Sequence, residues 1–248
     1  HQRADDPGQP LAADAPPDAH PAPPRVRAVV RHDGDGRLAA AILVASTTLS
    51  LLTLPLVAEL LWDRRLSVGT PFFLQCIWLV LISSPEVRLP ALQYLARRMP
   101  QLTDTTAKPL LSPNPGLMVR GIARTLDDEL LVRRNALDFV VSHLALSSHV
   151  VRAILNEDDR VILTDAVLGC VLRRDLSLNR RVYSWLLGPD GSEDYFEENA
   201  LKLVTCALRR GMAANEDRAL AQRPYKIFIS LLDKRAVGAP LIDALALD

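Results

Sequence analysis

The sequence predicts an all-α protein built as a HEAT- or armadillo-like helical-repeat solenoid. Hydrophobic residues make up 49% of the chain but aromatic residues only 5%, a balance that favours helices over β-sheets. Three segments resemble one another when they are aligned on Arg88, Arg133 and Arg180, which follow at intervals of 45 and 47 residues. HEAT and armadillo units have lengths in this range. The sequence has no run of short alternating strands and no glycine-rich phosphate loop, which argues against a βαβ nucleotide-binding fold.

Each of the three segments has the same internal order: a residue able to cap a helix, then the arginine, then one apolar helical face. The capping candidates precede the arginine by five residues and are Ser83, Asp128 and Asp175. Positions three and seven residues after the arginine lie on one face of a helix. We therefore expect the second helix of each pair at 83–95, 127–141 and 175–187.

Apolar runs between these segments predict the first helix of each pair, and the rest of the chain predicts further helices and loops. The first helices are expected at 72–84, 118–126 and 159–174, later helices near 194–212 and 224–235, and loops at 100–116, 188–193 and 213–223.

The beginning of the chain differs in composition from the rest. Residues 1–36 are rich in Pro, Ala and Asp without an apolar period, so we expect a flexible segment followed by a helical domain at 37–248. Because the first residue is His1 rather than Met, we expect a part of a longer protein. Residues 38–58 carry no charge over a length sufficient to span a bilayer. Central Ser and Thr residues and Pro55 favour a buried solenoid helix, with a transmembrane helix as the alternative.

Charges and reactive side chains predict no active site. The 29 basic and 29 acidic residues cancel, which argues against a nucleic-acid partner. The three cysteines are far apart and each lies in an apolar run, so we expect buried, reduced thiols in a cytosolic protein. His143 and His149 face different directions on a helix, and acidic clusters lie at helix starts, where they stabilise the helix dipole. We expect no catalytic, cofactor-binding or metal-binding residues and no enzymatic activity.

The densest motif of the sequence is LRRDLSLNRRVYSWLLG at 172–188. Its candidate functional residues are Arg173, Arg174, Asp175, Asn179, Arg180, Arg181, Tyr183 and Trp185, together with the repeat arginines Arg88 and Arg133.

Two interpretations of this motif stay open. In the structural one, Asp175 caps the next helix or pairs with Arg180, Asn179 bonds a neighbouring loop carbonyl, and Tyr183 and Trp185 fill the core. In the functional one, the four arginines bind an anionic lipid headgroup or an acidic peptide through bidentate contacts. We favour the structural interpretation, in which the motif joins one repeat to the next and can border a binding surface.

The same motif resembles the N-terminal region of the Dopey family, whose version reads LRRD, a hydrophobic residue, SLNRR, an aromatic residue and WLLG. Four further blocks match the family in order, and the resemblance covers about 70–248. The blocks are IWLVLISSPEVRLPALQYL, LLVRRNALDFVV, YFEENALKLV and PYKIFISLLDK.

The resemblance implies a large, non-enzymatic peripheral scaffold on the cytosolic face of Golgi and endosome membranes, acting in vesicle-mediated protein transport between them. It implies as partners a giant relative of Arf exchange factors of the Mon-two type and, in fungi, an aminophospholipid flippase. For animal members it implies kinesin light chain and phosphoinositide membranes. A direct anionic-lipid binding module or a kinesin adaptor on Golgi membranes is the alternative, and none of these contacts is assigned to particular residues.

Overall fold

The computed structural model describes residues 70–103, 105–214 and 221–246. The regular structure of these residues is entirely helical, without a β-strand. The expected all-α class is therefore confirmed. The expected flexible segment 1–36 and the charge-free stretch 38–58 lie outside the described residues.

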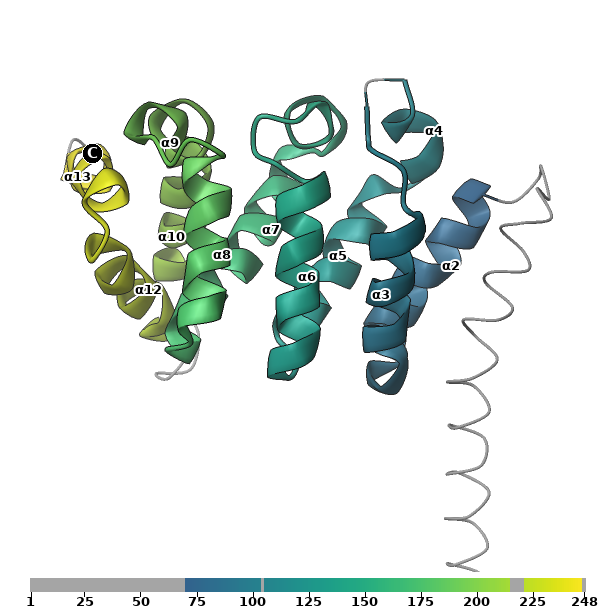
Figure 1. The fold of residues 1–248 in the computed structure, drawn as a ribbon. Coiled ribbons are helices and arrows are strands. Elements are labelled where there is room, and N and C mark those ends of the chain that lie inside the picture. The colour runs from purple at the N-terminus through teal and green to yellow at the C-terminus, as the bar shows by residue number, and fades with distance from the viewer. Residues whose placement is uncertain (1–69, 104, 215–220, 247–248) are drawn as a thin grey trace, which may run out of the picture. The chain divides into compact units, whose positions relative to one another are not determined.

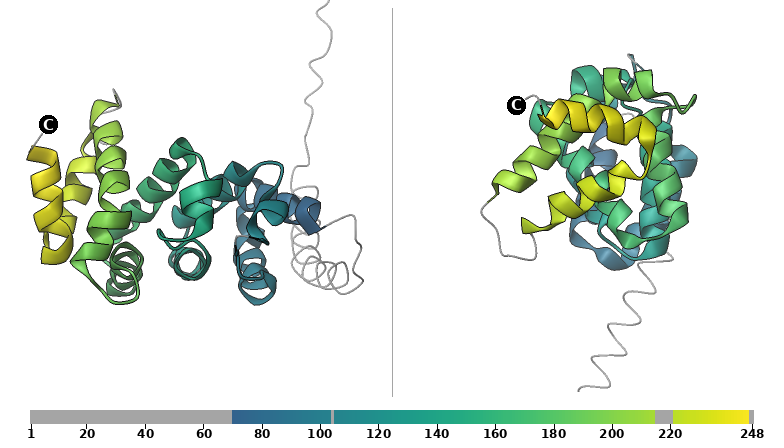
Figure 2. Two further views of the ribbon diagram at one scale, coloured as in Figure 1. Left: turned by 90° about the horizontal axis from the view of Figure 1, so that it is seen from above. Right: turned by 90° about the vertical axis from the view of Figure 1, so that its left-hand side faces the viewer.

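Most of the helices are arranged in two rows (Figure 1). One row contains α2 (Thr70–Ser83), α5 (Pro115–Leu126), α7 (Glu157–Gly169) and α10 (Leu201–Ala213), and the other contains α3 (Arg88–Arg98), α6 (Leu130–His143) and α8 (Leu176–Leu187). In the first row α5 packs between α2 and α7, and α10 packs on α7, whereas in the second row α6 packs between α3 and α8. The view from above separates the two rows (Figure 2).

Shorter elements join the helices, and two further helices follow the rows. The joining elements are the 3-10 turn η1 (Pro85–Val87), α4 (Ala107–Leu111), the π-helical turn η2 (Val150–Ile154), the 3-10 turn η3 (Cys170–Arg173) and α9 (Glu193–Asn199). The described part then closes with α12 (Arg223–Leu232) and α13 (Arg235–Ala246), which pack on each other and on α10.

The core lies between the two rows and between successive helices of each row. Trp78 of α2 and Phe139 of α6 meet edge to face with their ring centroids 6.0 Å apart, and both are buried. Ile122 of α5 is fully buried. Gly121 lets α5 approach α2 closely, because a Cβ there would lie 3.2 Å from the Trp78 carbonyl oxygen. Burial of such apolar surface is the main stabilising contribution to the fold.

The structure confirms the three predicted helix pairs and changes several details, among them the helix expected at 159–174, which ends at Gly169 and is followed by η3. The expected helix at 194–212 is two helices, because the chain bends at Ala200 (φ −111°, ψ −40°). The side chain of Asn199 donates to the Tyr195 carbonyl at this bend, so it competes with the backbone for helical hydrogen bonds. Helix α4 lies inside the expected loop 100–116, and α13 was not predicted.

Helix capping follows the prediction at one of the three expected positions. Asp175 caps α8 by accepting a 3.0 Å hydrogen bond from the Leu178 N–H. Ser83 does not cap a helix, since it belongs to the last turn of α2 and donates to the Leu79 carbonyl. Asp128 also fails to cap α6, which begins after Glu129 without a side-chain cap. Both residues precede their arginine by five positions, but η1 and the turn before α6 shift the helix starts.

Candidate functional site

Arg88 and Arg133 are buried and close the junction between the two helices of a pair. Arg88 Nε donates to the Leu81 carbonyl at 2.7 Å, and Arg133 Nε donates to the Leu126 carbonyl at 2.7 Å. In both cases the acceptor lies seven residues earlier, at the end of the first helix, where carbonyls lack a helical partner. The two repeat arginines therefore have equivalent structural roles.

Arg180 does not share this role, which corrects the three-fold alignment. Its side chain is exposed, and it forms no hydrogen bond or ion pair with described residues. The junction between α7 and α8 ends instead in η3 and in Arg174, which adopts a left-handed conformation (φ 53°). A left-handed residue is a usual helix stop, so this junction does not need a buried arginine.

Asp175 lies near the start of the 172–188 motif and contacts the preceding helix pair. Of the two roles predicted for it, the cap of α8 is confirmed and the pairing with Arg180 is not formed, since its ion-pair partner is Arg134 of α6, at 3.2 Å. The hydroxyl of Ser177 and the Leu178 N–H also donate to it. Hydrogen bonds from Ser177 and Leu178, together with Arg134, hold the pKa of the Asp175 carboxyl below its ordinary value.

Two of the four motif arginines are bound to aspartates of the preceding pair. Arg173 donates to Asp127 at 2.9 Å, and Arg181 makes two hydrogen bonds to Asp138 at 2.6 and 3.1 Å. Arg181 also donates to the Ser177 carbonyl, and its hydrogen bond with Asp138 raises the pKa of its guanidinium. These two arginines thus join neighbouring pairs, as the structural interpretation expects.

The other two, Arg174 and Arg180, are exposed and have no partner among the described residues. Between them lies Leu176, the first residue of α8, which is 86% exposed. This is an unusual position for a leucine, and it places an apolar side chain beside two unpaired cations.

The remaining residues of the motif serve the core. Trp185 is buried and donates from Nε1 to the Leu144 carbonyl, at the end of α6, at 2.7 Å. Tyr183 is half-buried and donates to the Ser230 carbonyl of α12 at 3.0 Å, and burial raises the pKa of its hydroxyl. Asn179 differs from the prediction, because its Oδ1 is buried without a hydrogen-bond partner.

Ion pairs between successive helix pairs recur along the described residues. Asp128 and Asp175, which the sequence alignment equates, each receive an arginine from the preceding pair. These ion pairs are Arg88–Asp128, Arg134–Asp175, Arg173–Asp127, Arg181–Asp138, Arg152–Glu198, Arg210–Asp158, Arg223–Asp165 and, at 3.9 Å, Arg120–Asp159.

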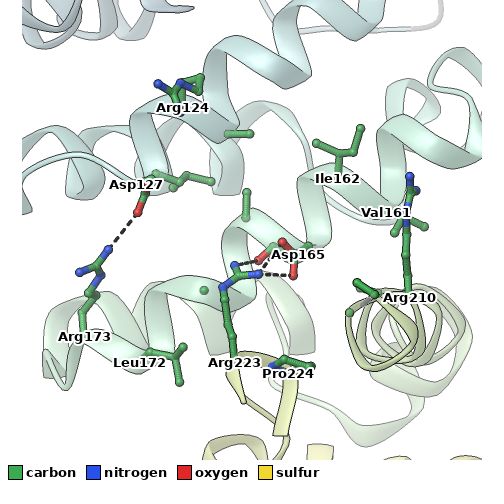
Figure 3. Close-up of a pocket in the computed structure, with 17 residues that line it drawn as sticks. Arg124, Asp127, Val161, Ile162, Asp165, Leu172, Arg173, Arg210, Arg223 and Pro224 are labelled. Carbon is green, nitrogen blue, oxygen red and sulfur yellow. Dashed lines mark hydrogen bonds and ion pairs between the residues drawn. The ribbon is translucent and has the colours of Figure 1, made fainter. Parts of the chain in front are cut away.

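A groove of about 830 Å³ opens along the first row of helices (Figure 3). It is lined by α5, α7, α10, α12 and η3. Alanines and glycines contribute six of the lining residues: Ala123, Ala166, Gly169, Ala207, Gly211 and Ala214. Two of the glycines make room for α12, since a Cβ at Gly169 would lie 2.6 Å from Arg223 Nη2 and one at Gly211 would lie 3.2 Å from Pro224 Cβ.

The charged groups of the groove are four arginines and two aspartates, a formal net charge of +2. Arg223 and Asp165 form a fork at its centre, with Nη1 at 2.8 Å from both carboxylate oxygens. Arg124 and Arg173 lie on one side of this fork and Arg210 on the other (Figure 3).

Sequence analysis did not identify Arg124, Arg210 or Arg223. They lie at the ends of three separate helices, so only the fold brings them together. A weak signal was present, because the first-row helices α5 and α10 both carry an arginine in their last turn.

Other reactive side chains have structural explanations. Cys170 is buried and burial raises its pKa to about 11, so the thiol stays protonated at neutral pH. Cys76 and Cys206 are only half-buried, contrary to the expectation, and all three cysteines are free. His143 packs on the Phe139 ring, and burial lowers its pKa. In the part of the chain that the structure describes, no three His, Cys, Asp or Glu residues gather as metal ligands would.

The fold and the groove define an all-α protein whose paired helices are joined by ion pairs and carry a basic recess. The sequence model of the family described as "Dopey, N-terminal" matches residues 52–191. The chain belongs to the Dopey family, as its motifs predict.

Several relatives share this region. Protein dop1 of Emericella nidulans is 33% identical over 227 residues, covering 71% of this chain and 12% of the relative. The DOP1 homolog of Drosophila melanogaster is 30% identical, covering 71% of this chain and 8% of the relative. DOP1 of Saccharomyces cerevisiae is 39% identical over 85 residues, covering 34% of this chain and 5% of the relative. The chain thus spans about a tenth or less of these relatives, and no solved structure matches it.

Proposed function

We propose that the chain is a HEAT- or armadillo-like solenoid segment of a non-enzymatic scaffold for vesicle-mediated protein transport between Golgi and endosomes. The observation that carries the proposal is the arrangement of the helices in two rows. Each two-helix unit packs on the next one, and ion pairs recur between successive units. Repeat proteins of this kind expose long surfaces that bind other proteins. Membership of the Dopey family supports the same role.

The proposed site of action is the cytosolic face of Golgi and endosome membranes, where the protein is peripheral. No helix of the described residues is long and apolar enough to cross a bilayer. The proposed partners are the Mon-two type relative of Arf exchange factors and, according to the organism, an aminophospholipid flippase or kinesin light chain. Each of them would bind a surface of the helix rows, and none requires a catalytic residue.

The proposal is tested in the organism that provides the full-length protein. The segment corresponding to 70–248 is removed from the chromosomal gene, and the return of a fluorescent cargo receptor from endosomes to the Golgi is followed by microscopy. We expect the receptor to accumulate in endosomes while total secretion continues. Normal recycling, with the shortened protein expressed at its usual level, would contradict the scaffold role of this segment.

A second candidate function is direct binding of anionic lipid, and the exposed Leu176 between Arg174 and Arg180 favours it. An apolar side chain beside unpaired cations can insert at a headgroup layer while the arginines contact phosphates. In this case Arg173 and Arg181 contribute little to lipid binding, since both already form ion pairs with aspartates.

Flotation with vesicles of phosphatidylcholine, with and without a phosphoinositide, tests this candidate. Leu176→Asp and Arg174→Glu should each reduce flotation with the anionic vesicles, and Arg124→Glu serves as the matched control outside the patch. Equal flotation of all variants would exclude the patch as the lipid-binding surface.

A further inference from the structure

We propose that the groove on the first helix row binds a short acidic segment of a protein partner, whose carboxylates meet Arg124, Arg173 and Arg210. This inference rests on the proposed scaffold function and names one surface and one class of ligand for it. The groove is defined by the 17 residues that line it, contributed by α5, α7, α10, α12 and η3.

Charge complementarity is the first argument. The lining is net positive by two charges in a chain whose total formal charge is zero, so basic side chains are concentrated there. Arg124 is exposed and has no partner among the described residues. Clusters of arginines that can form bidentate contacts are the usual receptors for carboxylate-bearing segments.

The existing ion pairs leave two further arginines available. Arg173 and Arg210 have side chains that are 50% and 58% exposed, and their partners Asp127 and Asp158 are 74% and 81% exposed. Exposed pairs of this kind contribute at most about 1 kcal/mol, so an incoming carboxylate can replace the aspartate at little cost. Arg223 is different, because Asp165 holds it in a fork and its Nη2 also donates to the Asp165 backbone carbonyl.

The shape of the groove favours a peptide segment over other anions. Half-buried Ile162 and Leu172 and the small side chain of Ala166 also line the groove, which gives aliphatic side chains of a ligand apolar contacts. A bilayer surface contacts projecting residues such as Leu176, whereas a recess lined by several helices admits a chain that enters it.

The test is fluorescence anisotropy with the whole chain and a short fluorescein-labelled peptide in which glutamates are separated by leucine and serine. We expect saturable binding that weakens as salt rises. Arg124→Glu and Arg210→Glu should each weaken it about tenfold, equivalent to about 1.4 kcal/mol. Arg97→Glu in α3 is the matched control, because it makes the same charge change at an exposed arginine that lies outside the groove and has no partner among the described residues. Circular dichroism of each variant establishes that it is folded.

Several results would overturn the inference. They are no saturable binding, equal binding of a peptide in which every glutamate is replaced by glutamine, and an equal loss in Arg97→Glu. Displacement of the peptide by phosphoinositide vesicles but not by excess unlabelled peptide would assign the groove to lipid instead. The peptide assay does not depend on transport in cells. If the peptide does not bind but receptor recycling still requires residues 70–248, only the groove assignment is wrong. If the peptide binds but recycling does not require residues 70–248, only the scaffold role is wrong.

Discussion

At the scale of single residues, the buried arginines have the largest expected effect on stability. Arg88 is 6% exposed and holds the Leu81 and Ile82 carbonyls and the Asp128 carboxylate. Arg88→Met keeps the aliphatic volume but leaves these acceptors without a donor, so we expect the free energy of unfolding to fall by about 2–3 kcal/mol. Arg180→Met, at the exposed position that the sequence aligns with Arg88, should change it by less than about 0.5 kcal/mol. Urea denaturation measures both, and equal losses would contradict the different roles of these arginines.

The carboxylate of Asp128 gives this junction a pH dependence. Burial alone would raise its pKa, but hydrogen bonds from Arg88 and from the Glu129 N–H outweigh burial and lower it below 3.8. A lowered folded-state pKa stabilises the protein above the unfolded-state value, and that stabilisation is lost as the pH falls through the folded-state value. Asp128→Asn should therefore be less stable than the wild type at neutral pH, with a difference that begins to shrink near pH 4 and vanishes only once the pH is below the folded-state pKa. A difference that stays constant between neutral and acidic pH would show that charge is not its cause.

The residue scale also shows where sequence reasoning reached its limit. Arg88 and Arg133 could be predicted as equivalent, because both precede an apolar helical face at the same spacing. Arg180 has the same sequence context but a different role, because the left-handed Arg174 ends the preceding helix first. A backbone conformation of this kind is rare outside glycine and leaves no mark in the sequence pattern.

At the scale of helices, capping separates two asparagines in similar positions. Asn156 caps α7 by accepting a 2.7 Å hydrogen bond from the Asp159 N–H, whereas Asn114 precedes α5 without a side-chain cap. We expect Asn156→Ala to lower the free energy of unfolding by about 1 kcal/mol, and Asn156→Ser to restore most of it. Asn114→Ala should be close to neutral. Thermal unfolding followed by circular dichroism gives the comparison, and equal effects of the two alanine variants would contradict the cap.

Helix positions followed from apolar periodicity, but helix breaks did not. The three pairs were predictable because each first helix is an apolar run and each second helix has one apolar face. The bend at Ala200 is accompanied by a local side-chain hydrogen bond of Asn199, which asparagines also form inside unbroken helices, as Asn135 does in α6. The 3-10 turn η3 that follows α7 packs against α8 and α12, and such tertiary contacts are invisible to a local pattern.

At the scale of the whole described unit, the groove shows the same division between local and assembled properties. Arg124, Arg210 and Arg223 are separated by up to about a hundred positions, and they line one groove only because α5, α7, α10 and α12 pack side by side. The densest sequence motif, 172–188, mainly joins helix pairs, and only Leu172 and Arg173 reach the groove. The motif that marks the family therefore contributes only part of the groove, whose other arginines come from α5, α10 and α12.

The proposed solenoid predicts which helices unfold locally when a core side chain is truncated. In a repeat array each pair is stabilised mainly by its neighbours, so loss of a core side chain near one end should open that end alone. Ile227 of α12 and Ile122 of α5 are both buried, and truncation of either to alanine should lower the free energy of unfolding by about 2–5 kcal/mol.

Hydrogen exchange followed by mass spectrometry under native conditions resolves the helices separately. In Ile227→Ala we expect faster exchange in α12 and α13 while α5 and α6 keep their protection. In Ile122→Ala the faster exchange should include α2, α5 and α7, which pack together. A uniform rise across every described helix in Ile227→Ala would show a single cooperative core, and the solenoid assignment would then be wrong.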